Sequence, residues 1–218
     1  MTHEYAVARR RMVREQIVAA GITDPAILAA LAEVPRHRFV PGPLQHRAYQ
    51  ASALPIGYGQ TISKPFTVGL MTALLELQGH EHVLEIGTGS GYQAAVLSRL
   101  TRSVVTIERI RPLADRARGL LAGLGYDNID VLAADGAAGC WDAAPFDAAV
   151  VTACSPGVPT QIIDQIRDGG FILLPIAAAG RQTLYRYQRR GSELVVEESV
   201  PCAFVPLLSG LEEGNTDA

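Results

Sequence analysis

Residues 81–176 contain short apolar runs rich in valine and isoleucine, separated by longer stretches with apolar residues at helical spacing. The short runs are typical of buried strands, and the longer stretches are typical of helices that bury one face. The predicted strands are 83–87, 103–108, 129–134, 147–152 and 171–175, and the predicted helices are 91–100, 112–124 and 159–167. Strands that alternate with helices pair in parallel and are covered on both faces. The pattern therefore predicts an α/β fold with a doubly wound, mostly parallel sheet.

Two helices are predicted ahead of this core. Apolar residues recur at near-helical spacing through residues 6–20, and Gly21 is placed to end that helix. Asp24-Pro25 is typical of an N-cap followed by proline in the first turn, and Pro35 marks the end of the second helix. We expect this N-terminal helical extension either to cover the open side of an active site or simply to pack against the core.

The C-terminal part of the pattern predicts an antiparallel hairpin. Apolar and polar side chains alternate in residues 183–188 and 193–198, as they do in strands, and the two segments flank a short turn that contains glycine. The whole chain is long enough for one large domain. We expect a single domain over 1–210, divided into 1–78 with the helices and a substrate loop, 79–176 as the cofactor-binding core, 177–210 with the last strands, and a flexible tail at 211–218.

Five prolines and several glycines fall between Pro35 and Pro65, so long regular elements are not expected there. The most informative part is Gly57–Pro65, which has two hydroxyls and an amide just before a helix predicted over 66–77. Hydroxyl and backbone N–H groups at a helix start can bind a carboxylate. The same residue types also serve as an ordinary turn and helix cap, so both interpretations stay open.

The strand predicted over 83–87 runs into the alternating glycines of Gly87–Gly91 and then into a helix. Glycines at such a turn let the backbone approach a ligand closely, because no Cβ stands in the way. A dinucleotide site has its third glycine or an alanine where this chain has Tyr92. The spacing therefore disfavours pyrophosphate, although a glycine-rich structural turn in another α/β protein remains the alternative.

Acidic residues near this turn favour a cationic cofactor. Glu85 lies two residues before the first glycine, where it would repel a phosphate and suit an ammonium or sulfonium group, both of which S-adenosylmethionine carries. Glu108 lies 21 positions after Gly87 at the end of the next strand, near the offset at which an acid meets ribose hydroxyls. Asp135 ends the third strand, where it either accepts an adenine N–H or caps the following turn.

Composition narrows the class of partner. A net charge of -3 and a pI near 5.9 give no reason to expect nucleic acid, and 48% hydrophobic residues predict a folded chain. Three scattered cysteines favour neither a metal cluster nor a disulfide framework. We therefore expect no metal, and we expect the protein to be found in a reducing compartment. The sequence has no apolar leader and no run of membrane-spanning length. We therefore expect a cytoplasmic protein without membrane contact.

With these residues assembled, the sequence resembles the protein-L-isoaspartate (D-aspartate) O-methyltransferase family over nearly all of residues 8–208. The resemblance is carried by Gly59-Gln60-Thr61-Ile62-Ser63-Lys64-Pro65, Val83–Tyr92, Thr106-Ile107-Glu108-Arg109, Asp135-Gly136, Pro145-Phe146-Asp147, Val151-Thr152-Ala153, Gly169-Gly170 and Phe204-Val205-Pro206-Leu207. Many methyltransferases share the glycine turn, whereas the first and last of these stretches are more specific. The resemblance implies a Rossmann-like class I methyltransferase fold.

The resemblance also implies a reaction: methylation by S-adenosylmethionine of the α-carboxylate of L-isoaspartyl residues, with D-aspartyl residues as a second class of substrate. The product cofactor is S-adenosylhomocysteine, and the ester closes to a succinimide that opens partly to normal aspartate. Substrates are damaged proteins and peptides, and the enzyme is expected to be a monomer. The family's active-site serine corresponds to Ser63, which would bind or orient the carboxylate, with neighbouring contacts from Thr61 and Ile62.

Cofactor contacts follow from the same resemblance. The implied set is Glu85, Gly87, Thr88, Gly89 and Ser90 for the methionine part, Glu108 for the ribose, and Asp135 with Gly136 for the adenine. The chain departs from the family at Cys154 and Ser155, where an alanine-rich segment is common. A nucleophilic cysteine is disfavoured there, because neither neighbour is histidine and methyl transfer needs no covalent intermediate.

Two rival functions stay open at this point. One is an S-adenosylmethionine-dependent carboxyl methyltransferase that acts on another small molecule or peptide. The other is a module that binds the cofactor without catalysis, which we expect to lack the Ser63 segment while it keeps the glycine turn. Both features are present in this chain.

Overall fold

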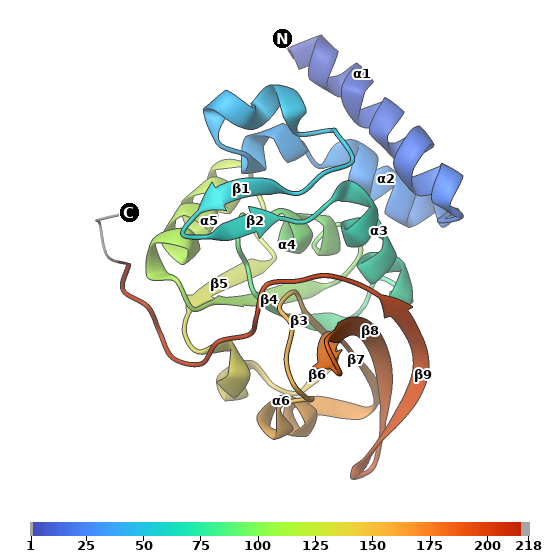
Figure 1. The fold of residues 1–218 in the computed structure, drawn as a ribbon, viewed down its shortest axis with the longest axis vertical. Helices are drawn as coiled ribbons and strands as arrows, with labels where there is room; N and C mark the ends of the chain where they lie inside the picture. The colour runs from blue at the N-terminus through green and yellow to red at the C-terminus, as the bar shows by residue number, and fades with distance from the viewer. Residues whose placement is uncertain (1, 215–218) are drawn as a thin grey trace.

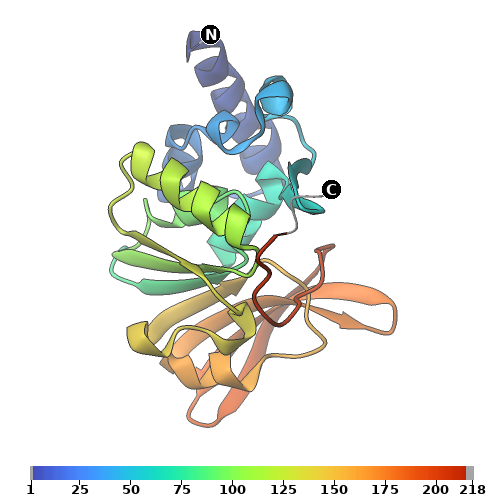
Figure 2. The same cartoon turned by 90° about the vertical axis from the view of Figure 1, so that its left-hand side faces the viewer.

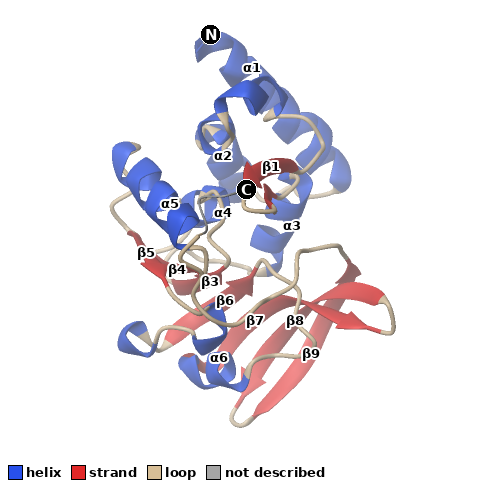
Figure 3. Cartoon of the chain, turned by 60° about the vertical axis from the view of Figure 1, so that its left-hand side comes forward, coloured by secondary structure: helices blue, strands red, loops and turns tan. Residues whose placement is uncertain are grey.

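Seven strands form one sheet in the order β5-β4-β3-β6-β7-β8-β9 in the computed structural model, which describes residues 2–214. The strands are β3 His82–Ile86, β4 Ser103–Glu108, β5 Ile129–Ala133, β6 Phe146–Val151, β7 Ile166–Ala178, β8 Arg181–Arg190 and β9 Glu193–Pro201. Strands β5, β4, β3, β6 and β7 pair in parallel, and β8 and β9 add antiparallel strands at one edge (Figure 3). The predicted α/β fold with a C-terminal hairpin is confirmed.

Helices cover both faces of the sheet, as Figure 2 shows. On one face lie α4 and α5 together with the N-terminal helices, and on the other lies α6 (Figure 3). The helices are α1 Thr2–Met12, α2 Pro25–Glu33, α3 Pro65–Leu74, α4 Tyr92–Leu97, α5 Arg111–Gly123 and α6 Thr160–Gln165. The most amphipathic is α5, which buries Leu113, Ala117 and Leu121. The alternating hydrophobic pattern thus places one helix after each of the first two core strands.

The N-terminal helices form much as the sequence predicts. The chain continues from α1 through a π-helical turn, Val13–Ile17, and a 3-10 turn, and it stops at Gly21, whose φ is 90°. Asp24 caps α2, because its Oδ1 accepts the amides of Ala26 and Ile27 at 2.8 and 3.2 Å. A left-handed glycine and an aspartate cap are strong local signals, and here each one determines a helix end.

The proline-rich segment contains more regular structure than expected. Two 3-10 turns, Arg36–Phe39 and Gly42–Arg47, precede an antiparallel hairpin made of β1 Leu54–Gly57 and β2 Gln60–Ile62. The hairpin turn uses positive φ angles at Tyr58 and at the glycines beside it. Strands of three or four residues leave too little alternation to detect, so the sequence pattern missed this hairpin.

One apolar core joins the N-terminal helices to α4 and α5 on the same face of the sheet. Ile17 and Leu31 pack in the same cluster as Tyr92, Val96 and Leu121, and all of them are nearly inaccessible to solvent. A second cluster lies under α3 and a third lies under α6. The N-terminal extension is therefore part of the main core, which holds β2 and the start of α3 rigidly beside the sheet.

The chain after β9 crosses the carboxyl ends of the parallel strands, as the red segment in Figure 1 shows. We call residues 205–213 the C-terminal strap. The amide of Cys154 donates to Val205 O at 2.7 Å, and the Arg111 and Glu212 amides donate to Glu212 O and Arg109 O at 2.9 and 2.7 Å. In the tail that is predicted to be flexible from 211, these bonds attach Glu212 to the chain between β4 and α5; residues 215–218 lie outside the described residues.

Candidate active site

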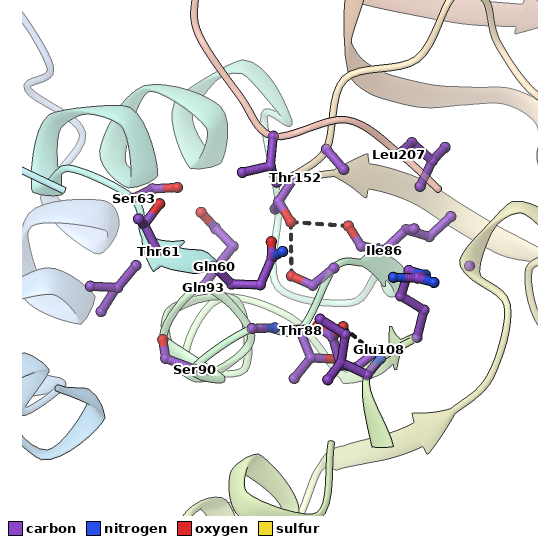
Figure 4. Close-up of a pocket in the computed structure, with 18 of the residues that line it drawn as sticks. Gln60, Thr61, Ser63, Ile86, Thr88, Ser90, Gln93, Glu108, Thr152 and Leu207 are labelled. Atoms are coloured by element: carbon purple, nitrogen blue, oxygen red, sulfur yellow. Dashed lines mark hydrogen bonds between the residues drawn. The ribbon is translucent and has the colours of Figure 1, made fainter. Parts of the chain in front are cut away.

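A cavity opens at the carboxyl ends of β3, β4 and β6, where ligands bind in sheets of this type. The space between its lining residues amounts to about 920 Å³ when the open solvent at its mouth is included. The residues expected from the sequence that line it are Thr61, Ile62, Ser63, Gly87, Thr88, Gly89, Ser90, Glu108 and Gly136. Figure 4 shows Ser63 and Thr61 at one end and Glu108 at the other, with Gln93 and Thr152 between them.

The glycine turn is held by its own backbone amides. The Gly87 and Thr88 amides donate to Ile107 O at 2.8 and 3.2 Å, and the Gly91 amide donates to Thr88 O at 2.8 Å. The Gly89 amide donates to Glu108 Oε2 at 2.8 Å. Amides that bond inside the protein do not cradle a phosphate. The turn therefore presents a close backbone surface without an anion site, as the missing dinucleotide spacing predicts.

Two glycines are required by close packing around this turn. A Cβ on Gly87, whose φ is 96°, would lie 2.3 Å from Thr152 Oγ1, and one on Gly136 would lie 2.4 Å from Ile86 Cγ2. The Thr152 hydroxyl in turn lies 2.8 Å from Gly87 O and 3.0 Å from Ile86 O (Figure 4). The carboxyl end of β6 is thereby fastened to the glycine turn, and Thr152 becomes part of the cavity wall.

Glu108 links the two loops that border the cavity. Its Oε2 accepts the Gly89 amide and its Oε1 accepts the Ile110 amide at 3.0 Å. The side chain is only 5% exposed, but it lines the cavity. Each carboxylate oxygen has two acceptor sites, so one remains on each oxygen for a ligand hydroxyl. This geometry suits a ribose diol.

Glu85 does not line the cavity, in contrast to the direct contact expected from the sequence. The side chain is fully buried in β3, where its Oε2 accepts the Thr106 hydroxyl at 2.5 Å. The Thr88 hydroxyl then donates to Thr106 Oγ1 at 2.7 Å. Glu85 Oε1 has no hydrogen-bond partner among the described residues. Burial raises the pKa of Glu85 to about 8, and the nearby Glu108 charge adds to the rise.

These contacts show how Glu85 is placed relative to the cavity, while its expected role in holding the cofactor stays a prediction. It lies beneath the wall formed by Thr88 and is linked to the cavity through the hydroxyls of Thr106 and Thr88. A cation in the cavity would favour the ionised carboxylate below it. The arrangement fits an ammonium or sulfonium group and disfavours a phosphate at the glycine turn.

Asp135 is also placed outside the cavity lining. Its Oδ1 accepts the Ala137 amide at 2.9 Å, and its Oδ2 accepts the Gly210 amide at 2.8 Å. The sequence left two interpretations open, and the turn-capping one describes these contacts. Asp135 thus fastens the C-terminal strap, its neighbour Gly136 lies in the cavity wall, and the adenine contact expected for the two residues stays a prediction.

Several lining residues were not assigned a role from the sequence. They are Gln60, Val68, Met71, Ile86, Tyr92, Gln93, Ile107, Arg109, Ile110, Thr152, Ala153, Val205, Pro206, Leu207 and Leu208. Gln93 is 7% exposed and donates to Thr72 Oγ1 at 3.0 Å, which fixes its amide at the centre of the cavity. Some of these residues fall in stretches that carry the family resemblance, which was the one signal able to find them.

Charge around the cofactor end of the cavity also argues against a cofactor that carries phosphates. Arg109 is the one Lys or Arg among the described lining residues, and its Nη1 pairs with Glu212 Oε2 of the strap at 2.6 Å. Residues 2–214 contain no group of three His, Cys, Asp or Glu side chains suited to a metal ion. Within the same range no helix has the length and apolar character needed to cross a bilayer. Cys154 is buried, which raises the pKa of its thiol, and it does not line the cavity.

A parallel sheet, a glycine turn whose amides bond within the protein, a buried acid beneath it and an acid at the end of the next strand are typical of a class I methyltransferase. The family description "Protein-L-isoaspartate(D-aspartate) O-methyltransferase" matches residues 8–212. The chain belongs to this family, which confirms the resemblance seen in the sequence.

Individual relatives agree over nearly the full length. Protein-L-isoaspartate O-methyltransferase 2 of Geotalea uraniireducens (strain Rf4) is 50% identical over 203 residues, which cover 93% of this chain and 94% of the relative. The protein-L-isoaspartate O-methyltransferase of Trichlorobacter lovleyi (strain ATCC BAA-1151 / DSM 17278 / SZ) is 48% identical over 205 residues, 94% of each chain. A solved protein-L-isoaspartate O-methyltransferase structure superposes with a TM-score of 0.85 at 27% identity, covering 94% of this chain and 67% of that one.

Proposed function

We propose that this protein methylates the α-carboxylate of L-isoaspartyl residues in damaged proteins and peptides, with S-adenosylmethionine as the methyl donor. The observation that carries the proposal is that Gln60–Ser63 and the glycine turn line one continuous cavity. The first is the stretch specific to the family, and the second is the cofactor turn common to methyltransferases. Family membership supports the same reaction. D-aspartyl residues, which the family description also names, are the second substrate class of this proposal.

The cofactor supplies a methyl group on a positively charged sulfur, which an oxygen nucleophile can attack in line. An isoaspartyl α-carboxylate is already ionised near neutral pH, so the chain needs no general base. The main task of its residues is to place the carboxylate oxygen against the methyl group and to exclude water. The methyl ester that forms loses methanol as the neighbouring amide closes a succinimide, and hydrolysis of that ring gives back aspartate in part.

The roles of individual residues follow from their positions. We assign the substrate carboxylate to the Ser63 hydroxyl, with neighbouring backbone contacts from Thr61 and Ile62, at one end of the cavity. At the other end Glu108 has acceptor capacity for the ribose hydroxyls. The walls for the rest of the cofactor are Gly87, Thr88, Gly89 and Ser90 for the methionine part and Gly136 for the adenine, with Glu85 acting from beneath.

Partners and compartment remain predictions of the sequence. Three free cysteines, two half-buried and one buried, fit a reducing cytoplasm. Isoaspartyl-containing chains are the expected macromolecular partners, and a monomer is the expected state. Sedimentation equilibrium of the purified protein would test the last point, since a dimer mass at micromolar concentration would contradict it.

The decisive test offers the protein two peptides that differ only in Asp or isoAsp at one position, together with methyl-labelled cofactor. We expect label on the isoAsp peptide alone. Equal labelling of both peptides would favour a carboxyl methyltransferase of broader specificity, and no labelling of the isoAsp peptide would contradict the repair function.

Ser63→Ala separates catalysis from cofactor binding in the same assay. We expect turnover to fall by at least tenfold, about 1.4 kcal/mol, because the variant loses a hydroxyl that orients the carboxylate. The affinity for S-adenosylhomocysteine, measured by calorimetry, should stay within about twofold. Ser192→Ala in the β8–β9 turn is a matched control on an exposed residue. A large loss of cofactor affinity with unchanged turnover of the bound complex would contradict the role of Ser63.

A further inference from the structure

A buried arginine lies behind the segment that carries Ser63. Arg36 begins the 3-10 turn Arg36–Phe39, and its side chain is 0% exposed. Its Nη2 donates to the backbone oxygen of Ser63 at 2.6 Å, and its Nε donates to the backbone oxygen of Ala48 at 2.7 Å. One guanidinium group therefore joins two chain segments that are distant in sequence.

The same guanidinium reaches the cofactor side of the cavity. Its central carbon lies 4.8 Å from the centre of the Tyr92 ring, and Tyr92 lines the cavity directly after the glycine turn. The face of an aromatic ring attracts a cation most strongly where water is excluded. Tyr92 is 1% exposed, so this contact is dry. Arg36 thus lies between Ser63 and the turn that begins at Gly87.

Arg36 has no carboxylate partner among the described residues, and its Nη1 is without any hydrogen-bond partner there. Burying a charge is costly unless it is paired, so a fold seldom keeps one for packing alone. An apolar side chain of similar length would fill this space at lower cost. A planar guanidinium, in contrast, carries several N–H donors in a rigid arrangement, so it can bind two carbonyl oxygens in a fixed relative geometry.

Holding a carbonyl oxygen fixes its peptide plane. The Ser63 carbonyl belongs to the residue whose hydroxyl faces the cavity, at the junction between β2 and α3. Lys64, which precedes α3, has no side-chain cap bond, so local helix capping does not fix this junction. The Arg36 bond takes that place and limits how far the Ser63 side chain can swing relative to the glycine turn.

We infer that Arg36 is a positioning residue for methyl transfer, which holds Ser63 at a fixed distance from the cofactor turn. This inference rests on the proposed function. Arg36 does not line the cavity, so its effect on the reaction passes through Ser63. A displacement of about 1 Å between reacting groups is enough to lower a rate by about 100-fold.

The test compares Arg36→Met, which keeps length without donors, with Arg36→Lys, which keeps charge without the fork. We expect kcat on the isoAsp peptide to fall by about 100-fold in Arg36→Met and by less in Arg36→Lys. The dissociation constant for S-adenosylhomocysteine should change by no more than about threefold in either variant. Amide hydrogen exchange in residues 58–66, followed by mass spectrometry, should become faster in both.

Arg186→Met is the matched control. Arg186 is also a buried arginine, 7% exposed, and its guanidinium stacks 3.8 Å from the Phe171 ring centre. It pairs with Glu76 and Glu197, away from the cavity lining. Its replacement should lower the melting temperature while kcat and exchange in 58–66 stay near the values of the unmodified protein.

The outcomes separate the two proposals. If Arg36→Met keeps kcat within threefold and exchange in 58–66 is unchanged, the positioning role is wrong. It is equally wrong if kcat falls only as the Kd for S-adenosylhomocysteine rises. If Arg36→Met does not fold, Arg36→Lys decides by the same two readouts. If the unmodified protein does not methylate the isoAsp peptide, the proposed function fails, while the exchange measurement still decides whether Arg36 holds the Ser63 segment.

Discussion

Glu85 is the site residue whose surroundings in the structure differ most from those expected from the sequence. The sequence predicts a charged group in contact with the ligand, whereas the structure shows a fully buried side chain with one oxygen unpartnered. Periodicity places Glu85 in a strand but does not say which face it points to, because a strand buried on both faces lacks alternation. The sequence therefore locates an acid in the strand before the glycine turn, but it cannot tell how far that acid lies from the cavity.

A pH dependence of stability follows from this burial. The pKa of Glu85 is raised by burial from 4.5 to about 8, so the folded protein holds the proton that the unfolded chain loses. The stabilising contribution is complete below pH 4.5 and is lost as pH rises to 8. At about 1.36 kcal/mol per unit, this loss reaches up to about 5 kcal/mol. Glu85→Gln should therefore gain stability over the unmodified protein between pH 5 and pH 8.

Urea unfolding at several pH values in this range measures that difference for both proteins. A difference in unfolding free energy that stays constant from pH 5 to pH 8 would show that Glu85 is ionised in the folded state. S-adenosylmethionine should narrow the difference, because its positive charge favours the ionised carboxylate.

Gly87 gives a second prediction at the residue scale. A Cβ there would lie 2.3 Å from Thr152 Oγ1, and the φ of 96° disfavours any side chain. Gly87→Ala should lower the unfolding free energy by roughly 2–5 kcal/mol and weaken cofactor binding. Gly119→Ala is the control, because Gly119 is exposed in α5 with nothing near its Cβ position, and it should gain about 0.5–1 kcal/mol. Similar losses for both variants in chemical denaturation would count against the close-packing explanation.

At the scale of elements, strong local signals were readable from the sequence and weak ones were not. The run 103–108 coincides with β4, because four consecutive apolar or β-branched residues, 104–107, end at an acid. The β1–β2 hairpin escaped notice, since three or four residues among prolines show no period. The position of the strap was not predicted for a different reason: it depends on bonds to Arg109, Asp135 and Cys154, which are far away in sequence.

The strap yields a prediction for cofactor affinity. Its residues Leu207 and Leu208 line the cavity, while Gly210 and Glu212 fasten it to Asp135 and Arg109. A chain ending at Ser209 loses these fastenings and should bind S-adenosylhomocysteine about tenfold more weakly, which corresponds to about 1.4 kcal/mol. A chain ending at Gly214 keeps them all and serves as the control. Calorimetry that finds equal affinities for the two chains would show that the strap does not support the site.

At the scale of the molecule, the parallel-sheet rule explains why the site was predictable in outline. Parallel strands bring their carboxyl ends to one edge, so the glycine turn, Glu108 and Gly136 had to meet there. The order β7-β8-β9 at the other edge was not predictable, because both hairpin strands alternate alike. Nor did the pattern show that Arg36 lies behind Ser63, since contacts between irregular segments leave no period in the sequence.

The shared core predicts that the whole chain unfolds as one unit. Residues before 79 supply Ile17 and Leu31 to the cluster that also holds Tyr92 and Val96, so neither portion keeps its core alone. Helix content by circular dichroism and fluorescence of the single tryptophan, Trp141, should therefore give coincident transitions in urea. Trp141 lies in the 3-10 turn that follows β5 and is far from α1 in the sequence. Its fluorescence therefore reports on the unfolding of the chain after residue 79. A fragment of residues 79–214 should remain unfolded; two separate transitions, or a folded fragment, would mean that 1–78 is an independent layer.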